Sequence, residues 1–299
     1  MTNPNPNPEL SILLVNFNGK RFLDDCLIAI AKHVSVPYEI ILVDNCSTDG
    51  SAEYVEQNHP ETRLIRNTRN VGFAAGNNLA ASSARGKYVL LLNNDTILQT
   101  DVNLAIRLIE SRPTIGAVGF KMLSPDLRPR ISTGHFPAPW RLIKFSSLFD
   151  KADGIKGIES SDGISYRTVD WIEGSFIFTT RSAWDAAGGL DEGYFMYVED
   201  VDFCQAIHRN GMQVAYVTTG AFIHYGGYSN ARLGLLISGY RRYHKKYSKL
   251  LPRLAANSVL SLGLLVRLAG FGIAYLATRD VELKRKSVSC AQALFSSPW

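Results

Sequence analysis

Apolar runs of strand length alternate with helical patterns through the first 120 residues, and this alternation limits the possible folds more than any other feature. The runs Ile40 to Val43 and Val89 to Leu92 are apolar throughout, as expected for strands buried on both faces of a parallel sheet. Between such runs apolar residues recur at helical spacing, as at Leu23, Leu27 and Ile30. The predicted class is therefore α/β, a Rossmann-like layered fold with a mostly parallel central sheet.

The predicted elements follow the order of that class. The first half contains predicted strands at Leu10 to Val15, Glu39 to Val43, Arg63 to Ile65, Tyr88 to Leu92 and Ile115 to Phe120, and predicted helices at Lys20 to His33, Ser51 to Asn58, Gly72 to Ser83 and Asp101 to Ser111. Residues 121–168 contain four prolines and no clear period, which predicts a long loop or insertion. Beyond it we expect strands at Val169 to Ile172, Phe176 to Thr180 and Gln213 to Val217, and helices at Arg181 to Ala187 and Asp200 to Asn210.

Polar residues follow three of the predicted strands. They form the runs Asn16 to Gly19, Asp44 to Gly50 and Asn93 to Thr96. Ligands of such sheets bind at the carboxyl ends of the strands, so these runs are predicted to meet at one binding edge. The sequence has no GxGxxG after the first strand and no GxxxxGK[ST], which argues against a dinucleotide oxidoreductase and against a P-loop ATPase.

The net charge of +5 divides unevenly along the chain. Residues 1–227 hold 20 basic and 25 acidic side chains, a balance of −5, whereas residues 228–299 hold 12 basic and 2 acidic side chains, a balance of +10. A nucleic-acid-binding fold would need the positive charge on its body, so we expect no nucleic-acid partner. The basic tail requires a separate explanation.

That tail contains a weakly polar stretch, Leu254 to Thr278, between basic clusters. Arg267 interrupts the stretch, and Arg253, Asn257 and Ser261 fall on one i, i+4 stripe. This pattern favours an interfacial amphipathic helix over a spanning one, and each Lys or Arg near an anionic membrane surface adds roughly 1 kcal/mol. The alternative is a helical appendage that packs on the main domain.

Residues 1–8 alternate Asn and Pro and have neither a basic nor an apolar segment, so we expect a disordered lead-in and no signal peptide. The predicted domains are thus 1–8, 9–227 and 228–299. Four cysteines lie far apart without a CxxC pair, which favours a reducing compartment. We therefore expect a cytoplasmic protein that associates peripherally with the inner face of the plasma membrane.

Four motifs together resemble family 2 glycosyltransferases, and in particular bacterial rhamnosyltransferases of cell-surface polysaccharide synthesis such as O-antigen assembly. The motifs are Val43 to Ser51, Asn70 to Asn78, Leu92 to Asp95 and Phe195 to Asp202. The resemblance runs from about Leu10 to His224 and implies the A-type glycosyltransferase fold. It also implies a nucleoside diphosphate sugar as donor and a lipid-linked or other saccharide as acceptor.

The resemblance places the donor on the polar strand ends. Its predicted nucleotide-sugar-binding residues are Asn16, Asn18, Asp44, Asn45, Asn70, Gly72, Asn77 and Asn94. A carboxylate such as Asp44 accepts hydrogen bonds from a pyrimidine N–H or a ribose hydroxyl. The alternative is an ordinary turn, because Asp-Asn and Asp-Gly pairs are common turn formers.

Asn93, Asn94 and Asp95 stand where the family has its metal-binding DxD, and His224 follows the last predicted strand. The resemblance implies that Asp95 and His224 hold Mg2+ or Mn2+, which bridges the donor diphosphate. Asn93 replaces the first aspartate of that motif, so Asp95 supplies its charge alone. The alternative is a turn that ends the strand.

Glu199 and Asp200 resemble the family's ED motif, whose aspartate is the general base. Asp200 is the predicted base of an inverting transfer, supported by Glu199, and Asp202 is the second candidate. The alternative is purely structural, because carboxylates in the first turn of a helix stabilise its dipole by about 0.3–1 kcal/mol. Trp171, Glu173 and Gly174 resemble the loop that closes over sugar and acceptor, although Trp171 also suits a hydrophobic core.

The leading hypothesis is a metal-dependent transferase that moves one sugar, rhamnose or a related hexose, to a lipid-linked acceptor. The segment Gln205 to Asn210 lacks the QxxRW of processive synthases, so a single transfer is expected. Two alternatives remain. One is a non-catalytic, membrane-tethered nucleotide-sugar-binding protein, and the other is a nucleotide-sugar pyrophosphorylase, whose first loop would be rich in glycine and arginine.

Overall fold

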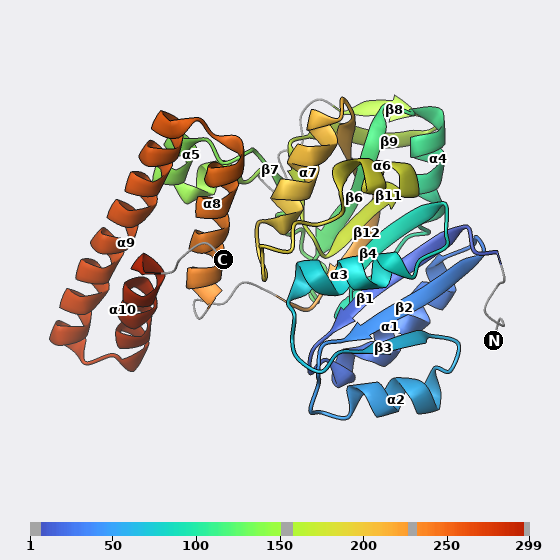
Figure 1. Ribbon diagram of the computed structural model, residues 1–299, viewed down its shortest axis with the longest axis horizontal. Helices are drawn as coiled ribbons and strands as arrows, with labels where there is room; N and C mark the ends of the chain where they lie inside the picture. Colours follow the sequence, from blue (N-terminus) through green and yellow to red (C-terminus); the bar gives the residue numbers. More distant parts are fainter. Residues whose placement is uncertain (1–6, 151–157, 227–231, 296–299) are drawn as a thin grey trace.

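The computed structural model describes residues 7–150, 158–226 and 232–295 (Figure 1). The predicted lead-in lies mainly in residues 1–6, outside the described residues. The strands are β1 (Leu10–Asn16), β2 (Tyr38–Asp44), β3 (Arg63–Arg66), β4 (Tyr88–Asn93), β5 (Thr96–Leu98), β6 (Ile115–Leu123), β7 (Thr133–Gly134), β8 (Glu159–Ser161), β9 (Ile164–Val169), β10 (Trp171–Ile172), β11 (Phe176–Thr180) and β12 (Gln213–His224). The helices are α1 (Lys20–His33), α2 (Ser51–Asn58), α3 (Phe73–Ser82), α4 (Asn103–Ser111), α5 (Pro139–Ile143), the 3-10 turn η1 (Phe145–Leu148), α6 (Arg181–Ala187), α7 (Glu199–Arg209), α8 (Leu233–Tyr247), α9 (Leu250–Thr278) and α10 (Val281–Leu294).

The main sheet has the order β3-β2-β1-β4-β11-β6-β12-β9-β8, and β5 pairs with β12. Strands β1 to β4 form parallel pairs, β6 pairs in parallel with β12, and β11 runs antiparallel between β4 and β6. These pairings orient seven of the ten strands in one direction, namely β1 to β4, β6, β8 and β12. The predicted layered α/β fold with a mostly parallel sheet is confirmed.

Hydrophobic cores lie on both faces of this sheet. Leu14 and Leu90 belong to the core that α1, α2 and α4 cover, whereas Leu13 and Leu91 belong to the core that α3, α6 and α7 cover. All four side chains are fully buried. Successive strand residues point to opposite faces, so an uninterrupted apolar run fills both cores. Burial of each such side chain stabilises the fold by about 1.5–3 kcal/mol.

Three predicted elements were wrong in extent. The predicted loop 121–168 contains β9, which pairs antiparallel with β12; its residues alternate between buried and partly exposed, so it lacks a continuous apolar run. The predicted strand Val169 to Ile172 is divided, because β9 ends at Val169 and Trp171–Ile172 pairs instead with β7. The predicted last strand Gln213 to Val217 continues to His224 after a shift in register.

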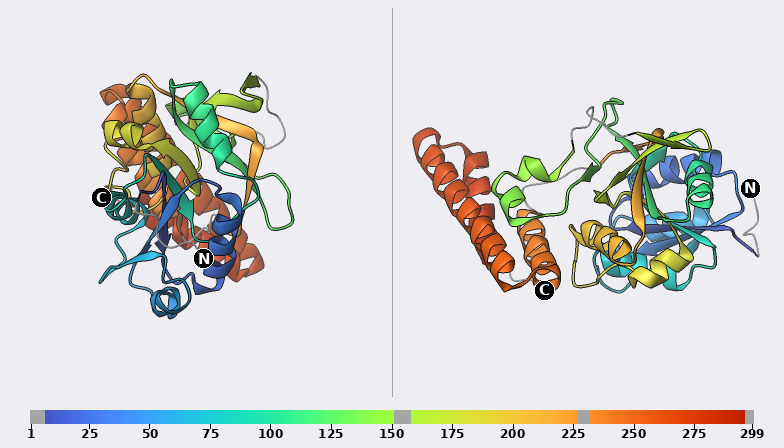
Figure 2. Two further views of the ribbon diagram at one scale, coloured as in Figure 1. Left: turned by 90° about the vertical axis from the view of Figure 1, so that its right-hand side faces the viewer. Right: turned by 90° about the horizontal axis from the view of Figure 1, so that it is seen from above.

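The C-terminal helices extend to one side of the sheet domain (Figures 1 and 2). Helix α8 packs on the body, where its Leu233, Ile237 and Tyr240 belong to the core cluster that also contains residues of α7. This contact favours grouping α8 with the sheet domain, so the predicted division after residue 227 stays a proposal. Helix α9 lies against α8, α10 and α5.

Helix α9 turns its apolar side outward. Part of its polar stripe faces the neighbouring helices: Ser261 Oγ accepts from Arg241 Nη2 of α8 at 3.3 Å, and Asn257 Oδ1 is buried. The predicted interfacial position of this amphipathic tail stays a proposal. The exposed large apolar residues of α9 are Leu250, Leu251, Leu254, Leu262, Leu265, Val266, Ile273 and Leu276. Among the described residues α9 is the helix long and apolar enough, by length and composition, to cross a membrane; its mean hydropathy reaches 1.9 in a segment that is 11% buried.

Candidate functional site

Polar side chains from three strand ends meet at one edge of the sheet. Asn16, at the end of β1, donates from Nδ2 to Asp44 Oδ1 (2.8 Å) and to Ser47 Oγ (3.0 Å). Asn94, which follows β4, donates from Nδ2 to Asn16 Oδ1. Ser47 N donates to Asp44 Oδ2 at 2.9 Å. The parallel alignment of β1, β2 and β4 thus produces a preformed hydrogen-bonded cluster of Asn16, Asp44 and Asn94.

The remaining residues predicted to bind the donor hold loops in place. Asn45 Nδ2 donates to Gly72 O at 3.0 Å, and Gly72 N donates to Asn70 Oδ1 at 2.9 Å. Asn77 Nδ2 donates to Phe73 O at 3.0 Å. A glycine is needed at position 72, because its φ is +88° and a Cβ there would lie 2.4 Å from Phe195 O.

Asn18 joins the strand-end cluster through Ser47, because Asn18 N donates at 2.9 Å to the Ser47 Oγ that also accepts from Asn16. The Asn18 side chain accepts from Thr48 N at 2.8 Å and lines a separate, open hollow with Lys20 and Asp49. The strand-end cluster and the hollow therefore lie on neighbouring loops, and the structure does not bring Asn18 into direct contact with Asp44.

Asp95 and His224 form a close pair between the end of β4 and the end of β12. Asp95 Oδ1 lies 3.3 Å from His224 Nε2, and both side chains are largely buried. Asn93 Nδ2 lies 3.4 Å from the same His224 nitrogen. Burial lowers the pKa of His224, but the hydrogen bond to Asp95 and the nearby charge of Glu173 outweigh it, so that pKa is raised above its ordinary value.

These two side chains fit a divalent cation. A Cβ on Gly226 would lie 2.6 Å from Asp95 Oδ2 and 2.8 Å from His224 Nε2, so the glycine keeps free space next to both ligand atoms. In the part of the chain that the structure describes, no group of three or more His, Cys, Asp or Glu side chains is placed to hold a metal. Mg2+ and related cations are commonly held by one or two protein ligands together with substrate phosphates.

Glu199 and Asp200 begin α7 after a strained turn. Tyr197 and Val198 both have positive φ angles, +72° and +75°, and a β-branched residue such as Val198 rarely adopts this conformation. The turn directs Asp200 toward the loop before β11, where Asp200 Oδ2 accepts from Gly174 N at 3.0 Å. Strain of this kind is common at functional sites.

Burial dominates the electrostatics of this acidic pair. Burial and the charge of Glu173 raise the pKa of Asp200 to about 7. Burial and the charge of Asp200 raise the pKa of Glu199 well above its ordinary value, and Glu199 Oε2 is buried without a hydrogen-bond partner. Asp200 keeps partial solvent exposure, and a partly buried carboxylate with a pKa near neutrality is a candidate proton acceptor.

One cavity of about 580 Å³ brings these groups together. Asn93, Asp95 and His224 line it together with Glu173, Gly174, Glu199, Asp200 and Trp171. Trp171 is buried, and its Nε1 donates to His135 O at 3.1 Å, so it serves both the core and the cavity wall. The strand-end cluster is not part of this lining, although Asn94 lies between two residues that are.

The cavity also has a wall that sequence analysis missed. This wall comes from residues 130–149, α8 and α9, and includes Arg130, Phe149, Leu236, Tyr240 and Arg267. Arg267 was visible in the sequence as a charge within an apolar helix, but only the fold shows which way that helix faces.

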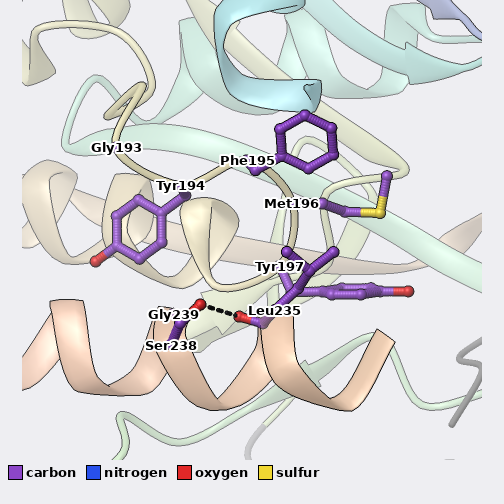
Figure 3. A pocket seen from close by; sticks show the side chains of 8 residues that line it. All are labelled: Gly193, Tyr194, Phe195, Met196, Tyr197, Leu235, Ser238 and Gly239. Carbon is purple, nitrogen blue, oxygen red and sulfur yellow. Dashed lines mark hydrogen bonds between the residues drawn. The ribbon is translucent and has the colours of Figure 1, made fainter. Parts of the chain in front are cut away.

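The loop that carries the strained turn rests on α8. Figure 3 shows the side chains of Tyr194 to Tyr197 spreading from this loop above α8. A Cβ on Gly239 of α8 would lie 2.8 Å from Val198 Cγ2 and 2.9 Å from Tyr197 O, so glycine permits this close approach. Helix α8 therefore supports the turn that positions Glu199 and Asp200.

Residues 11–172, which are 162 of the 299 residues, match the family described as Glycosyl transferase family 2. The chain is 27% identical over 243 residues to N-acetylglucosaminyl-diphospho-decaprenol L-rhamnosyltransferase of Mycobacterium tuberculosis, covering 75% of this chain and 78% of the relative. It is 31% identical over 170 residues to Rhamnosyltransferase WbbL of Escherichia coli, covering 53% of this chain and 62% of the relative.

Solved structures of glycosyltransferases share the fold. GalNAc-T7 with UDP, GalNAc and Mn2+ aligns with a TM-score of 0.60 at 15% identity, over 81% of this chain and 48% of the other. Mannosyltransferase PcManGT from Pyrobaculum calidifontis, in complex with GDP-Man and Mn2+, aligns with a TM-score of 0.56 at 16% identity, over 99% of this chain and 89% of the other. The predicted A-type glycosyltransferase fold is confirmed.

Proposed function

This chain belongs to glycosyltransferase family 2, and from that premise we propose that it transfers one sugar, with inversion, from a nucleoside diphosphate sugar to a lipid-linked saccharide. The main support is the single cavity that joins the Asp200 carboxylate to the Asp95–His224 pair. Relatives named as rhamnosyltransferases, one of them by name acting on a diphospho-decaprenol, support rhamnose as the sugar and a polyprenyl diphosphate as the lipid carrier.

Asp200 acts as the general base in this proposal. Its carboxylate takes the proton of the acceptor hydroxyl while that oxygen attacks the anomeric carbon from the face opposite the diphosphate. The bond from the anomeric carbon to the diphosphate breaks, and the nucleoside diphosphate leaves with the electron pair. The bond from Gly174 N orients the carboxylate, and Glu199, with its raised pKa, stays protonated and adds no second charge beside it.

Asp95 and His224 are the residues that would hold Mg2+ or Mn2+. When bound there, the cation neutralises charge on the leaving diphosphate. Asn93 then contributes an amide where the family has a carboxylate, and it remains within reach of His224. Asp44, with Asn16 and Asn94, is proposed to receive the base and ribose of the donor, and Trp171, Glu173 and Gly174 to border the sugar and acceptor.

We further propose that the enzyme works in the cytoplasm at the inner face of the plasma membrane, with α9 lying on an anionic surface. The exposed apolar side of α9 and the basic residues of α10 support a membrane contact. A spanning α9 would place Arg267, which lines the active cavity, in hydrocarbon. A peripheral position avoids that cost.

The test supplies purified protein with a panel of nucleotide sugars and with N-acetylglucosaminyl diphosphate linked to polyprenol, with and without chelator. We expect transfer from deoxythymidine diphosphate rhamnose, loss of transfer in chelator and its recovery with Mg2+ or Mn2+. Asp200→Asn is expected to lower kcat by about 10²- to 10⁴-fold, whereas Asp185→Asn, a change at an exposed position of α6, is expected to leave it unchanged.

NMR of the product decides whether the anomeric configuration is inverted. Full activity of Asp200→Asn would show that another residue is the base. Donor binding by the wild type without transfer to any acceptor would favour the non-catalytic nucleotide-sugar-binding protein instead.

A further inference from the structure

The active cavity continues beyond the acidic pair into an apolar wall. Six large apolar or aromatic side chains form this wall: Ile131, Phe145, Phe149, Leu233, Leu236 and Tyr240. They come from the segment after β6 and from α8. A nucleotide sugar is polar over its whole length, so a wall of this chemistry suits a different ligand.

Among the described residues that line the cavity, three carry a side chain with a permanent positive charge, and all three are arginines. They are Arg130, Arg232 and Arg267. Arg130 Nη1 donates to the carbonyl oxygens of His224 (3.1 Å) and Gly226 (2.6 Å), and Arg232 Nη1 to Tyr197 Oη at 3.3 Å. Within the described residues none of the three has an ion pair with a carboxylate. Their charge is therefore available to an anion, and guanidinium groups match phosphate geometry well.

Arg267 occupies an unusual position for a charged residue. It lies within α9, whose segment of high hydropathy is mostly exposed and apolar. Its guanidinium lies 5.6 Å from the ring centroid of Phe145, so it points toward the cavity and not toward the outer face of α9.

Apolar side chains are exposed on α5, next to Phe145 of the lining, and on α9, which carries Arg267 of the lining. Helix α5 packs on α9 and exposes Trp140 (71%) and Ile143 (73%). The outward residues of α9, such as Leu262 and Ile273, continue the same type of surface. These residues offer apolar surface on α5 and α9 for a long apolar chain.

From these observations we propose that Arg130, Arg232 and Arg267 bind the diphosphate of a polyprenyl-linked acceptor. The apolar wall receives the first isoprene units, and the rest of the chain follows α5 and α9 into the membrane. This proposal rests on the proposed function and assigns its acceptor subsite. Charge complementarity supports this occupant, because each phosphate of the acceptor is negative and the arginines supply the matching positive charge.

The experiment compares Arg267→Gln with Arg253→Gln in the full chain. Both changes remove one positive charge from α9, but Arg253 does not line the cavity. We expect Arg267→Gln to raise the KM for N-acetylglucosaminyl diphospho-polyprenol by about 10- to 100-fold, the loss typical of a charge-assisted hydrogen bond. The donor KM, the rate of donor hydrolysis and the KM for an alkyl N-acetylglucosaminide without diphosphate are expected to stay unchanged.

Three results would overturn the proposal. A rise in donor KM would assign Arg267 to the donor diphosphate, and equal losses in both variants, matched by weaker sedimentation with anionic vesicles, would assign it to membrane attraction alone. Binding of farnesyl diphosphate, followed by calorimetry, separates this proposal from the proposed function. If no sugar is transferred but Arg267→Gln still weakens that binding, the subsite stands and the transferase assignment fails; if binding is unchanged, the subsite fails.

Discussion

The catalytic body and the C-terminal helices α9 and α10 place their apolar and charged residues in opposite ways. In the body, apolar strands are covered on both faces, and the polar strand ends bond to one another. In α9 part of the polar stripe faces its neighbours and the apolar side faces outward. The difference indicates that the body is surrounded by water, whereas the outer face of α9 contacts a less polar medium.

One pair of substitutions tests this difference with the largest expected effect. Leu91→Ala, in the sheet core, is expected to lower the free energy of unfolding by about 2–5 kcal/mol, because it leaves a cavity where the side chain was fully buried. Leu262→Ala removes the same atoms from a side chain that is 62% exposed. It is expected to leave the unfolding free energy almost unchanged and to weaken binding to anionic vesicles. Chemical denaturation and vesicle sedimentation measure the two effects.

The opposite pattern would contradict the comparison. If Leu262→Ala destabilised the fold as much as Leu91→Ala, the outer side of α9 would be buried in the protein in solution. If vesicle binding did not respond to Leu262→Ala, the apolar side would not be the membrane contact.

We expect helix α8 to contribute to the free energy of unfolding of the body. A substitution of Lys246 tests this expectation. Lys246 Nζ lies 2.7 Å from Asp202 Oδ2 and 3.0 Å from Asp191 Oδ2. The Asp202 side chain is 3% exposed and that of Lys246 is 39% exposed. Lys246→Met leaves Asp202 buried without this cation, and we expect a loss of about 2 kcal/mol in unfolding free energy, below the usual range for buried pairs because the ammonium is partly solvated.

The neighbouring residue provides the matched control. Lys245 is exposed, so Lys245→Met is expected to change the unfolding free energy by less than about 0.5 kcal/mol. Equal stability of the two variants in urea would mean that α8 contributes no more than a surface appendage.

The periodicity of the sequence predicted the body well because its strands are apolar throughout. Helices α1, α2 and α6 and strand β11 have the predicted bounds. Strand β9 was missed, because it alternates polar and apolar residues and contains Arg167. The direction in which α9 faces could not be predicted from the sequence either, because it follows from contacts with other helices, such as the burial of Leu260 and Leu264 and the hydrogen bond from Arg241 to Ser261.

Those residues of the candidate site that belong to a local sequence motif could be predicted. Asp95, His224 and Asp200 lie around one cavity because the strand ends and α7 converge there. Arg130 and Arg267 were not predicted as lining residues, because no local pattern links them. Contacts between distant segments of the chain determine which residues line the cavity in this way. A single sequence contains no information on those distances.

The body and the C-terminal helices are expected to differ in their effect on the ionisation of Asp200. Burial and Glu173, both features of the body, raise the pKa of Asp200 to about 7 from its ordinary value of 3.8. A protonated Asp200 accepts no proton, so we expect kcat to fall about tenfold per pH unit below that pKa. Glu173→Gln removes the repulsion and is expected to move the midpoint of the pH profile lower. Arg267→Gln, a change in the C-terminal helices, is expected to leave that midpoint unchanged.

The same raised pKa has an opposite consequence for stability. Between pH 3.8 and about 7 the folded protein holds a proton on Asp200 that the unfolded chain has lost. The contribution of this group to the free energy of unfolding therefore falls as pH rises through that window. Asp200→Asn is expected to remove this contribution, so that its stability declines less than that of the wild type over the same interval. Denaturation at a series of pH values measures the slope; parallel slopes would show that Asp200 ionises at its ordinary pKa and that burial does not control the base.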